Sequence, residues 1–252
     1  MRLSVLALCP YPSPCGDSRL VDDVIASASD AGVSCVALTC PDGAAAASEV
    51  ATGLGKLGLK FGSTADPTDG AGGASPVVLS QLAILDSVTD RDDESGSPLI
   101  VCARLAMSPN TVIDLVVASH PPDHGADARA VRSFTERLPR IHDARRPQPP
   151  PRRGPKRRAD AAQPDQSTTR IVIAACFYPA NADSHYRAEM SDAGFLSIIP
   201  AALDEPAGGA SDAITVRLYV RPHLRPGLLV SPPHAPLTTL RDYRAILAGF
   251  EV

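Results

Sequence analysis

The sequence predicts an α/β (α+β) fold in which two mixed β-sheets pack face to face and helices cover their outer faces. The first observation is a series of short apolar segments, about nine or ten, most of which follow one another in adjacent pairs. The second is that helical segments are few, about four, so strands and helices do not alternate as in a doubly wound sheet. The third is size and composition: 252 residues, 44% hydrophobic and 21% charged, are enough for a sizeable core.

The amino-terminal part contains two strand–helix units. Residues 3–9 and 33–38 are apolar runs bounded by turn-forming residues, so both are expected to be strands. A helix is expected over 19–31, where apolar residues share one face and Gly32 stops the helix. A second, alanine-rich helix is expected over 43–55.

Paired strands fill the middle of the chain. A loop of Gly, Ser, Asp and Thr at 62–75 precedes them. The acidic residues 90–94 predict one turn, and residues 108–110 predict another. The expected strands lie at 76–80, 82–88, 99–105 and 112–118, and a helix follows over 126–138.

The carboxyl-terminal part repeats the mixture of strands and a helix. Residues 170–177 form an apolar run typical of a buried strand. A helix is expected over 183–193 and ends at Gly194. Two further strands are expected at 214–220 and 243–250.

A basic, proline-rich segment interrupts the chain at 143–168. Its central part, 145–158, contains seven Arg or Lys, five Pro and no acidic residue. Such a stretch cannot build a core, and its prolines oppose a helix. We therefore expect a single domain over 1–252 that carries 143–168 as a disordered surface insertion. The alternative role for the insertion is an electrostatic tether for a phosphate-rich partner.

Charge and cysteine usage exclude several classes of protein. With 24 basic and 28 acidic side chains the net charge is −4, which disfavours a protein that coats nucleic acid with its whole surface. No stretch approaches the roughly 20 apolar residues of a membrane span, and the first apolar run is too short for a signal-peptide core. The six cysteines form no CxxC pair, which favours a reduced, cytoplasmic protein over a disulfide scaffold.

Eight segments carry sequence patterns of a known family, in the family's order. Residues 36–40 are similar to "VALQE", 172–178 to "viaGDFN" and 240–246 to "lSDHrai". The other five are 6–9, 75–85, 115–120, the helix with Arg129 and Arg132, and 215–220. Together they resemble the endonuclease/exonuclease/phosphatase superfamily, over nearly the whole chain outside the loops and 143–168.

This resemblance implies a four-layer α/β/β/α sandwich and a metal-dependent phosphohydrolase. It implies Mg²⁺ or Mn²⁺ as the cofactor, because both ions prefer carboxylate oxygens, and a phosphate ester or nucleic acid as the partner. Two residues match the family's functional positions. His120 would face the scissile phosphate, and Asp242 belongs to the last motif.

Other functional positions of the family are substituted at the ends of the expected strands. Cys9 stands where the first strand of the family has Asn, and Cys40 stands where it has the metal-binding Glu. Cys176 and Tyr178 occupy the Asp and Asn positions of the "GDFN" motif. The resemblance therefore implies that a metal ligand and the Asp that orients water are both missing.

The last two motifs are altered as well. Val216 occupies an Asp position, and Tyr243 occupies the position of the general-base His. A tyrosine with a pKa of about 10 is a poor base at pH 7, so hydrolysis is expected to be impaired. The competing interpretation is an active divalent-metal phosphohydrolase with diverged motifs.

The cysteines suggest a third interpretation. If the strand ends converge, Cys9, Cys40, Cys176 and His120 would supply three thiolates and an imidazole, which is a tetrahedral Zn²⁺ set. The simpler interpretation is that these cysteines fill space as small apolar side chains.

Overall fold

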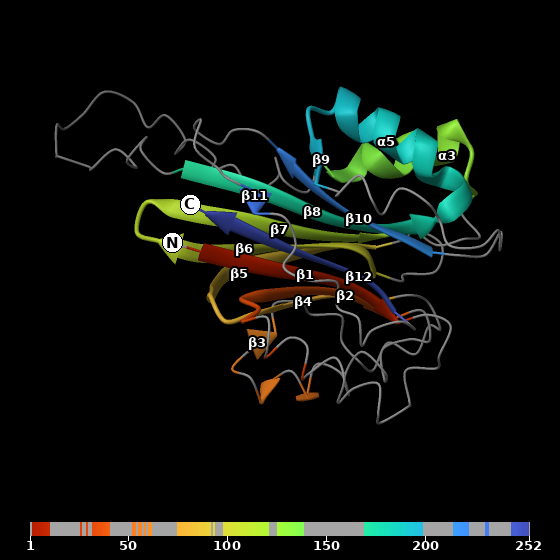
Figure 1. The fold of residues 1–252 in the computed structure, drawn as a ribbon. Helices are drawn as coiled ribbons and strands as arrows, with labels where there is room; N and C mark the ends of the chain where they lie inside the picture. Colours follow the sequence, from red (N-terminus) through yellow and green to blue (C-terminus); the bar gives the residue numbers. More distant parts are fainter. Residues whose placement is uncertain are drawn as a thin grey trace, which may run out of the picture.

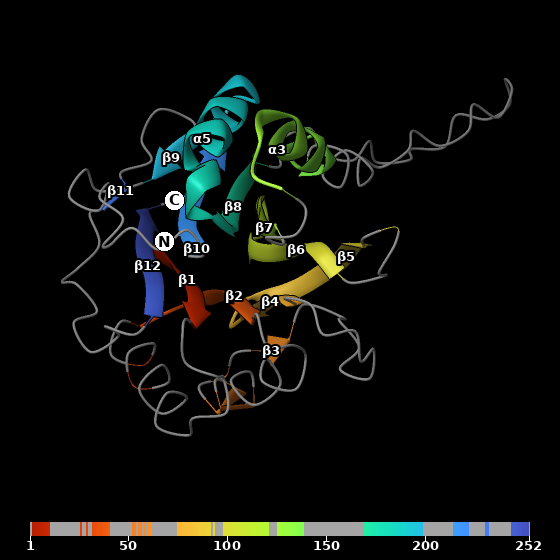
Figure 2. The same ribbon diagram turned by 90° about the vertical axis from the view of Figure 1, so that its right-hand side faces the viewer.

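The fold consists of two six-stranded mixed sheets that pack face to face, with helices over the outer face of one of them (Figure 1). The computed structural model describes residues 2–10, 26, 29, 32–40, 52, 53, 55, 56, 58, 60, 61, 75–91, 93, 98–120, 125–138, 169–198, 214–221, 230, 231 and 243–251. Figure 2 shows the layers in cross-section: the helices α3 and α5, then the sheet that contains β8, then the sheet that contains β1. The predicted sandwich of two packed mixed sheets is confirmed.

The first sheet has the strand order β11-β12-β1-β2-β4-β3. Its strands are β1 (Arg2–Pro10), β2 (Cys35–Cys40), β3 (Lys60–Phe61), β4 (Ser75–Ser80), β11 (Val230–Ser231) and β12 (Tyr243–Glu251). β1 and β2 run parallel, and the other pairs are antiparallel. The two parallel strands therefore finish at the same end of this sheet.

The second sheet has the strand order β5-β6-β7-β8-β10-β9. Its strands are β5 (Ala83–Arg91), β6 (Pro98–Ser108), β7 (Thr111–Ser119), β8 (Thr169–Pro179), β9 (Leu196–Ile198) and β10 (Ile214–Arg221). Here β7 and β8 run parallel, and Ala118 lies opposite Cys176 in their register. These central strands are buried on both faces, which explains their continuous apolar runs.

Alternation of side chains divides the buried residues into two cores. The inter-sheet core lies between the sheets and includes Val5, Cys9, Val117 and Phe177. The helix-facing core lies between the second sheet and the helices and includes Ala118, Cys176, Tyr178, Val131 and Met190. Because successive residues of a strand point to opposite faces, neighbours such as Cys176 and Phe177 belong to different cores.

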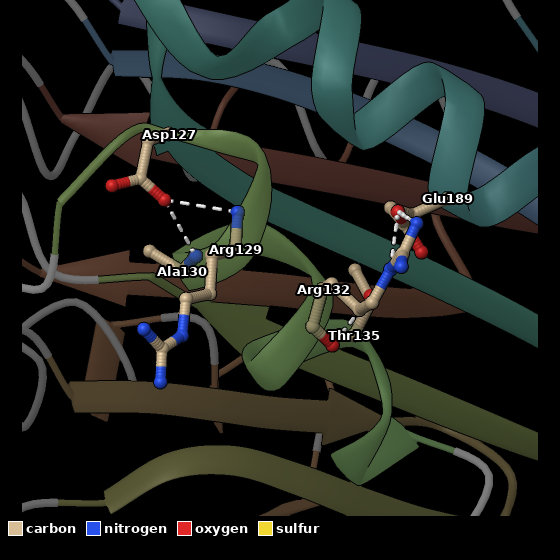
Figure 3. Close-up of polar contacts among 6 residues, drawn as sticks. All are labelled: Asp127, Arg129, Ala130, Arg132, Thr135 and Glu189. Atoms are coloured by element: carbon tan, nitrogen blue, oxygen red, sulfur yellow. Dashed lines mark hydrogen bonds and ion pairs between the residues drawn. The ribbon is translucent and has the colours of Figure 1, made fainter.

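In the described part of the chain, the second sheet is covered by the helices α3 (Ala128–Thr135) and α5 (Asp183–Asp192). Figure 3 shows that Asp127 caps α3: its side chain accepts hydrogen bonds from the backbone N–H groups of Arg129 (2.9 Å) and Ala130 (2.8 Å). In the same view Arg132 of α3 forms an ion pair with Glu189 of α5 at 2.9 Å. A short 3-10 turn, Ala180–Ala182, connects β8 directly to α5.

Gly194 ends α5, as the sequence predicts. Its φ of 79° lies in the left-handed region that glycine adopts without strain, and its N–H donates to the carbonyl of Ser191 at 2.9 Å. The N–H of Phe195 then donates to the carbonyl of Met190 at 2.9 Å, which turns the chain into β9.

The structure corrects two of the predicted boundaries. The turn predicted at 90–94 cannot begin at residue 90, because β5 continues to Arg91 and Asp90 pairs with Ile100 of β6. Arg137 lies 3.4 Å from the carboxylate of Asp90, so this acidic residue is accommodated within a strand. Helix α3 begins at Ala128, two residues after the predicted start at 126, because Asp127 is its N-cap; it ends at Thr135, and residues 137–138 are helical again.

Several predictions fall outside the described residues. The segment 143–168 lies outside entirely, and most of the helices predicted over 19–31 and 43–55 do so too. Of the helices that the structure does describe, none is long and apolar enough to cross a membrane.

The Asp127 cap predicts a pH dependence of stability. The backbone N–H donors, Ala130 first, lower the pKa of Asp127 from its usual value. Since the folded-state pKa is the lower one, the stabilisation is present above the unfolded-state pKa of about 3.9 and is lost as the pH falls through the folded-state value. Urea unfolding should therefore show that the wild type loses more stability between pH 5 and pH 3 than Asp127→Asn, which keeps an acceptor but cannot titrate. Equal losses in the two proteins would contradict this role.

Candidate functional site

The carboxyl ends of the parallel strands meet at one end of the sandwich. The hydroxyl of Thr39 in β2 donates a hydrogen bond to the hydroxyl of Ser119 in β7 at 3.0 Å, although the two strands belong to different sheets. We call this region the carboxyl end of the sandwich; it is formed by residues 9–10 of β1, 39–40 of β2, 119–120 at the end of β7 and 177–179 of β8. The carboxyl end is where ligands most often bind in α/β sheets, because loops and strand ends converge there.

Three of the predicted site residues, His120, Cys176 and Tyr178, come together under the helices. The backbone N–H of His120 donates to the carbonyl of Phe177 at 2.8 Å, which continues the β7–β8 pairing past the end of β7. Cys176 and Tyr178 both belong to the helix-facing core, together with Tyr186 of α5. All four side chains are buried.

Cys9 does not join this group. It is fully buried in the inter-sheet core, whereas Cys176 is fully buried in the helix-facing core on the other side of the second sheet. Val216, at the family's Asp position, also faces the inter-sheet core. Two strand ends can meet at one end of a sandwich while their side chains point to different faces, and this is the case for β1 and β8.

For two further predicted site residues, Cys40 and Tyr243, the structure gives the position in a strand. Cys40 is the last residue of β2, and Tyr243 is the first residue of β12, where it lies opposite Pro10 of β1. Both positions are therefore at the carboxyl end of the sandwich. Asp242 lies outside the described residues.

Cys176 is a protonated thiol at neutral pH. Burial raises its pKa to about 12, because the thiolate would lose its hydration in an apolar core. A thiol of this kind is a poor nucleophile at pH 7, since nucleophilic attack needs the thiolate. Its surroundings match the simpler interpretation of a small apolar side chain that fills a core.

Tyr178 is held by a polar network at the start of α5. Its hydroxyl donates to the carboxylate of Asp183 at 2.8 Å and lies 3.2 Å from the hydroxyl of Tyr219. Burial is the main cause that raises the pKa of Tyr178 far above its usual value, and Tyr219 and Asp183 add to it. The phenol therefore stays protonated and acts as a hydrogen-bond donor in this network.

An ion pair between Arg217 of β10 and Asp183 of α5 completes the network. The guanidinium donates through two nitrogens to the two carboxylate oxygens, with Nη2 at 2.6 Å from Oδ2. Only 7% of the Arg217 side chain and 24% of the Asp183 side chain are exposed. Burial alone would lower the pKa of Arg217, but the bond to Asp183 outweighs it and the pKa is raised. In the sequence, the sign of this pair is a charged residue, Arg217, inside the otherwise apolar run 214–220.

His120 is enclosed by aromatic rings from both helices. Its ring stacks on Phe134 of α3 with centroids 4.8 Å apart, and it meets the edge of Tyr186 of α5 at 5.6 Å. The Nδ1 atom lies 2.5 Å from the hydroxyl of Tyr186. Nothing in the local sequence marks Tyr186 as part of this group, because its partner is 66 positions away.

Comparison with known proteins gives a clear answer for the fold. No protein-family model matches the sequence, and the search of curated proteins found no match. Solved structures do match over the whole chain. The human nocturnin catalytic domain with bound sulfate has a TM-score of 0.62 at 10% identity, and the match covers 99% of this chain and 94% of nocturnin.

Two further structures agree. Sphingomyelinase C from Streptomyces griseocarneus matches with a TM-score of 0.59 at 15% identity, over 99% of both chains. TDP2 from D. rerio, in complex with a single-strand DNA product, matches with a TM-score of 0.56 at 12% identity, over 100% of this chain and 99% of that one. These proteins are members of the superfamily that the motifs resemble. The chain has the endonuclease/exonuclease/phosphatase fold.

The described part of this endonuclease/exonuclease/phosphatase fold does not fit the metal ions considered above. A hard ion such as Mg²⁺ needs carboxylate oxygens, but at the end of β8 Cys176 and Tyr178 present a protonated thiol and a phenol. A Zn²⁺ site built from Cys9 and Cys176 is excluded by their placement in two separate cores. Within the residues described, no group of three His, Cys, Asp or Glu side chains is arranged to hold a metal.

Proposed function

We propose that this protein binds a phosphate ester or nucleic acid at the carboxyl end of the sandwich and is impaired in hydrolysing it. The observation that carries the proposal is the chemistry of the side chains at the carboxyl end of β8. Cys176 and Tyr178 are buried there beneath α5, and the hydroxyl of Tyr178 donates a hydrogen bond to Asp183. Neither of these two side chains supplies a carboxylate for a metal or a group that takes a proton from water, and the nearby carboxylate of Asp183 is already bound by Tyr178 and Arg217.

Metal-dependent hydrolysis of a phosphate ester requires charge neutralisation and an activated water molecule. A general base must accept the proton of that water at neutral pH. Neither a thiol whose pKa is raised to about 12 nor a phenol that donates to a carboxylate accepts a proton readily. The loss of several such groups together is expected to reduce the rate by many orders of magnitude.

Two observations support the binding half of the proposal. His120 remains at the end of β7, where Ser119 and Thr39 tie the two sheets together. Nocturnin, which shares the fold, was solved with a bound sulfate, and TDP2 was solved with a DNA product. We extend from these proteins only the chemical class of ligand, an anionic phosphate or sulfate group.

We further infer a single domain over 1–252 in a reducing, cytoplasmic setting. The cysteines at 9, 35, 102 and 176 are buried in the two cores or beside them, which supports a role in packing. The basic segment 145–158 remains a candidate tether for the phosphate backbone of a nucleic acid, because its seven positive charges are concentrated in fourteen positions.

Binding can be tested with a fluorescein-labelled single-stranded oligonucleotide and fluorescence anisotropy at low salt without metal. We expect saturable binding that inorganic phosphate reduces and that weakens with rising salt. His120→Gln should weaken it about ten- to hundredfold, since a hydrogen bond to a charged oxygen contributes about 1.5–3 kcal/mol. His185→Gln is the matched control, because it makes the same substitution at a histidine of α5 whose charged neighbour is the Asp127 cap of α3. We therefore expect it to leave binding unchanged. No binding by the wild type, or equal affinities for the wild type and His120→Gln, would contradict the proposal.

A further inference from the structure

Asp114 is a fully buried carboxylate inside the apolar strand β7. Its Oδ1 atom lies 3.0 Å from Nε of Arg104 in β6, and its Oδ2 atom accepts a hydrogen bond from Nε of Arg170 in β8. The side chain of Asp114 is 0% exposed, whereas those of Arg104 and Arg170 are 20% and 25% exposed. One carboxylate therefore connects β7 to both of its neighbours, near the amino ends of β7 and β8.

The two ion pairs differ in what else fixes the alignment of the strands that they join. β6 and β7 form a hairpin with a two-residue turn, in which Ser108 pairs with Thr111, so the turn sets their register. β7 and β8 are parallel, and the chain between them runs from residue 120 to residue 168. A connection of this length imposes no register, so the side chains of the two strands have to select it.

Apolar packing selects the register of β7 and β8 only weakly. Apart from Asp114, residues 113–118 of β7 and 171–177 of β8 supply apolar side chains to both the inter-sheet core and the helix-facing core. A shift of two residues keeps every side chain on its own face, because side chains alternate along a strand with a period of two. Such a shift would therefore place apolar residues opposite apolar residues once more.

The charged residues distinguish the observed register from both shifts of two residues. A shift in one direction would bring Arg170 opposite Asn110, about 13 Å along the strand from Asp114. A shift in the other direction would move Arg170 into the buried position of Val172, which lies opposite Arg221 of β10. The first shift takes a charge partner from a buried carboxylate, and the second buries a guanidinium opposite another positive charge, so both are unfavourable.

We propose that Asp114 is a register lock, which uses its ion pair with Arg170 to select the alignment of β8 against β7. At the other end of these strands, the same alignment lets the N–H of His120 donate to the carbonyl of Phe177 at 2.8 Å. The lock therefore determines which residues of β8 reach the carboxyl end of the sandwich. Selection of a register is the best-attested role of buried ion pairs, which often add little net stability. This role does not depend on the proposed function.

The alignment of the two strands can be measured by NMR, through scalar couplings across backbone hydrogen bonds in the full chain labelled with ²H, ¹³C and ¹⁵N. In the wild type we expect one coupling from the N–H of His120 to the carbonyl carbon of Phe177. We expect a second coupling from the N–H of Thr169 to the carbonyl carbon of Asn110. These two couplings report the register at the two ends of β8.

Arg170→Met removes the guanidinium that joins β8 to Asp114 and leaves the carboxylate paired with Arg104. We expect a second set of β8 amide signals that lacks both couplings. Arg104→Met is the matched control, because it makes the same substitution at the other partner of Asp114, within a hairpin whose turn already sets the register. It should keep one set of signals and both couplings. One set of signals with both couplings in Arg170→Met would overturn the proposal, as would the same loss in both variants.

A variant without any of the three charges keeps the test decisive if the single variants do not fold. Arg104→Met, Asp114→Val and Arg170→Met together leave no buried carboxylate to pair, so this variant should fold. With the lock removed, it should show the second set of β8 signals. One set of signals with both couplings intact would show that the register does not depend on Asp114. Failure of this variant to fold would overturn the proposal as well, because the three charges would then be needed for stability rather than for alignment.

Discussion

Replacing Cys176 by Asp is expected to lower the free energy of unfolding by about 3–5 kcal/mol at pH 7, because it places an unpaired carboxylate in a buried, largely apolar core. Cys176 is fully buried among apolar and aromatic side chains, and even its weakly acidic thiol has a pKa raised to about 12. Asp is the residue that the family has at this position, so the experiment asks whether the site still accepts the family's chemistry. Chemical denaturation at pH 7 measures the effect.

The pH dependence of the same variant distinguishes the charge from a change in packing. The protonated acid is less costly to bury than the carboxylate, so the loss in Cys176→Asp should shrink as the pH falls from 7 to 5. Cys176→Ala removes the thiol without adding a charge and should cost about 1–2 kcal/mol at every pH. If the Asp and Ala variants are equally stable at pH 7, the end of β8 is hydrated and the argument for impaired catalysis is weakened.

Removing the guanidinium of Arg217 is expected to cost about 2–4 kcal/mol, because it leaves Asp183 without its charge partner at a largely buried position. The ion pair ties the first turn of α5 to β10, so its loss also loosens the helix that covers Cys176 and Tyr178. Arg217→Lys keeps the charge but not the two-point contact and should fall between the wild type and Arg217→Ala.

A double-mutant cycle tests whether the pair itself is responsible. Asp183→Asn in the Arg217→Ala background removes the remaining buried charge, so the double variant should be more stable than the sum of the two single losses predicts. Strict additivity would show that Arg217 and Asp183 stabilise the protein independently. Urea unfolding of the wild type and the three variants provides all four free energies.

The strands of the fold were predictable because their sequence pattern is local. The runs 33–38, 112–118 and 170–177 consist almost entirely of apolar residues, and they became β2, β7 and β8 with shifts of a few residues. Strands buried on both faces leave such continuous runs. The end of β5 was not predictable, because Asp90 is accommodated by Arg137, a residue 47 positions later in the chain.

The site was predictable in part. The structure places His120, Cys176 and Tyr178 near one another, since β7 and β8 are parallel neighbours. Cys9 was expected in the same place, but its side chain points into the inter-sheet core. The contacts that define the site, Tyr186 with His120 and Arg217 with Asp183, join distant parts of the chain and leave no local pattern.

The central claim, that catalysis is impaired, is tested most directly by turnover of bis-p-nitrophenyl phosphate with Mg²⁺, Mn²⁺ or Zn²⁺. The wild type is predicted to release no p-nitrophenol above the rate of the metal alone, and His120→Gln should be indistinguishable from it. The contradicting result is metal-dependent turnover by the wild type that disappears in His120→Gln and persists in His185→Gln.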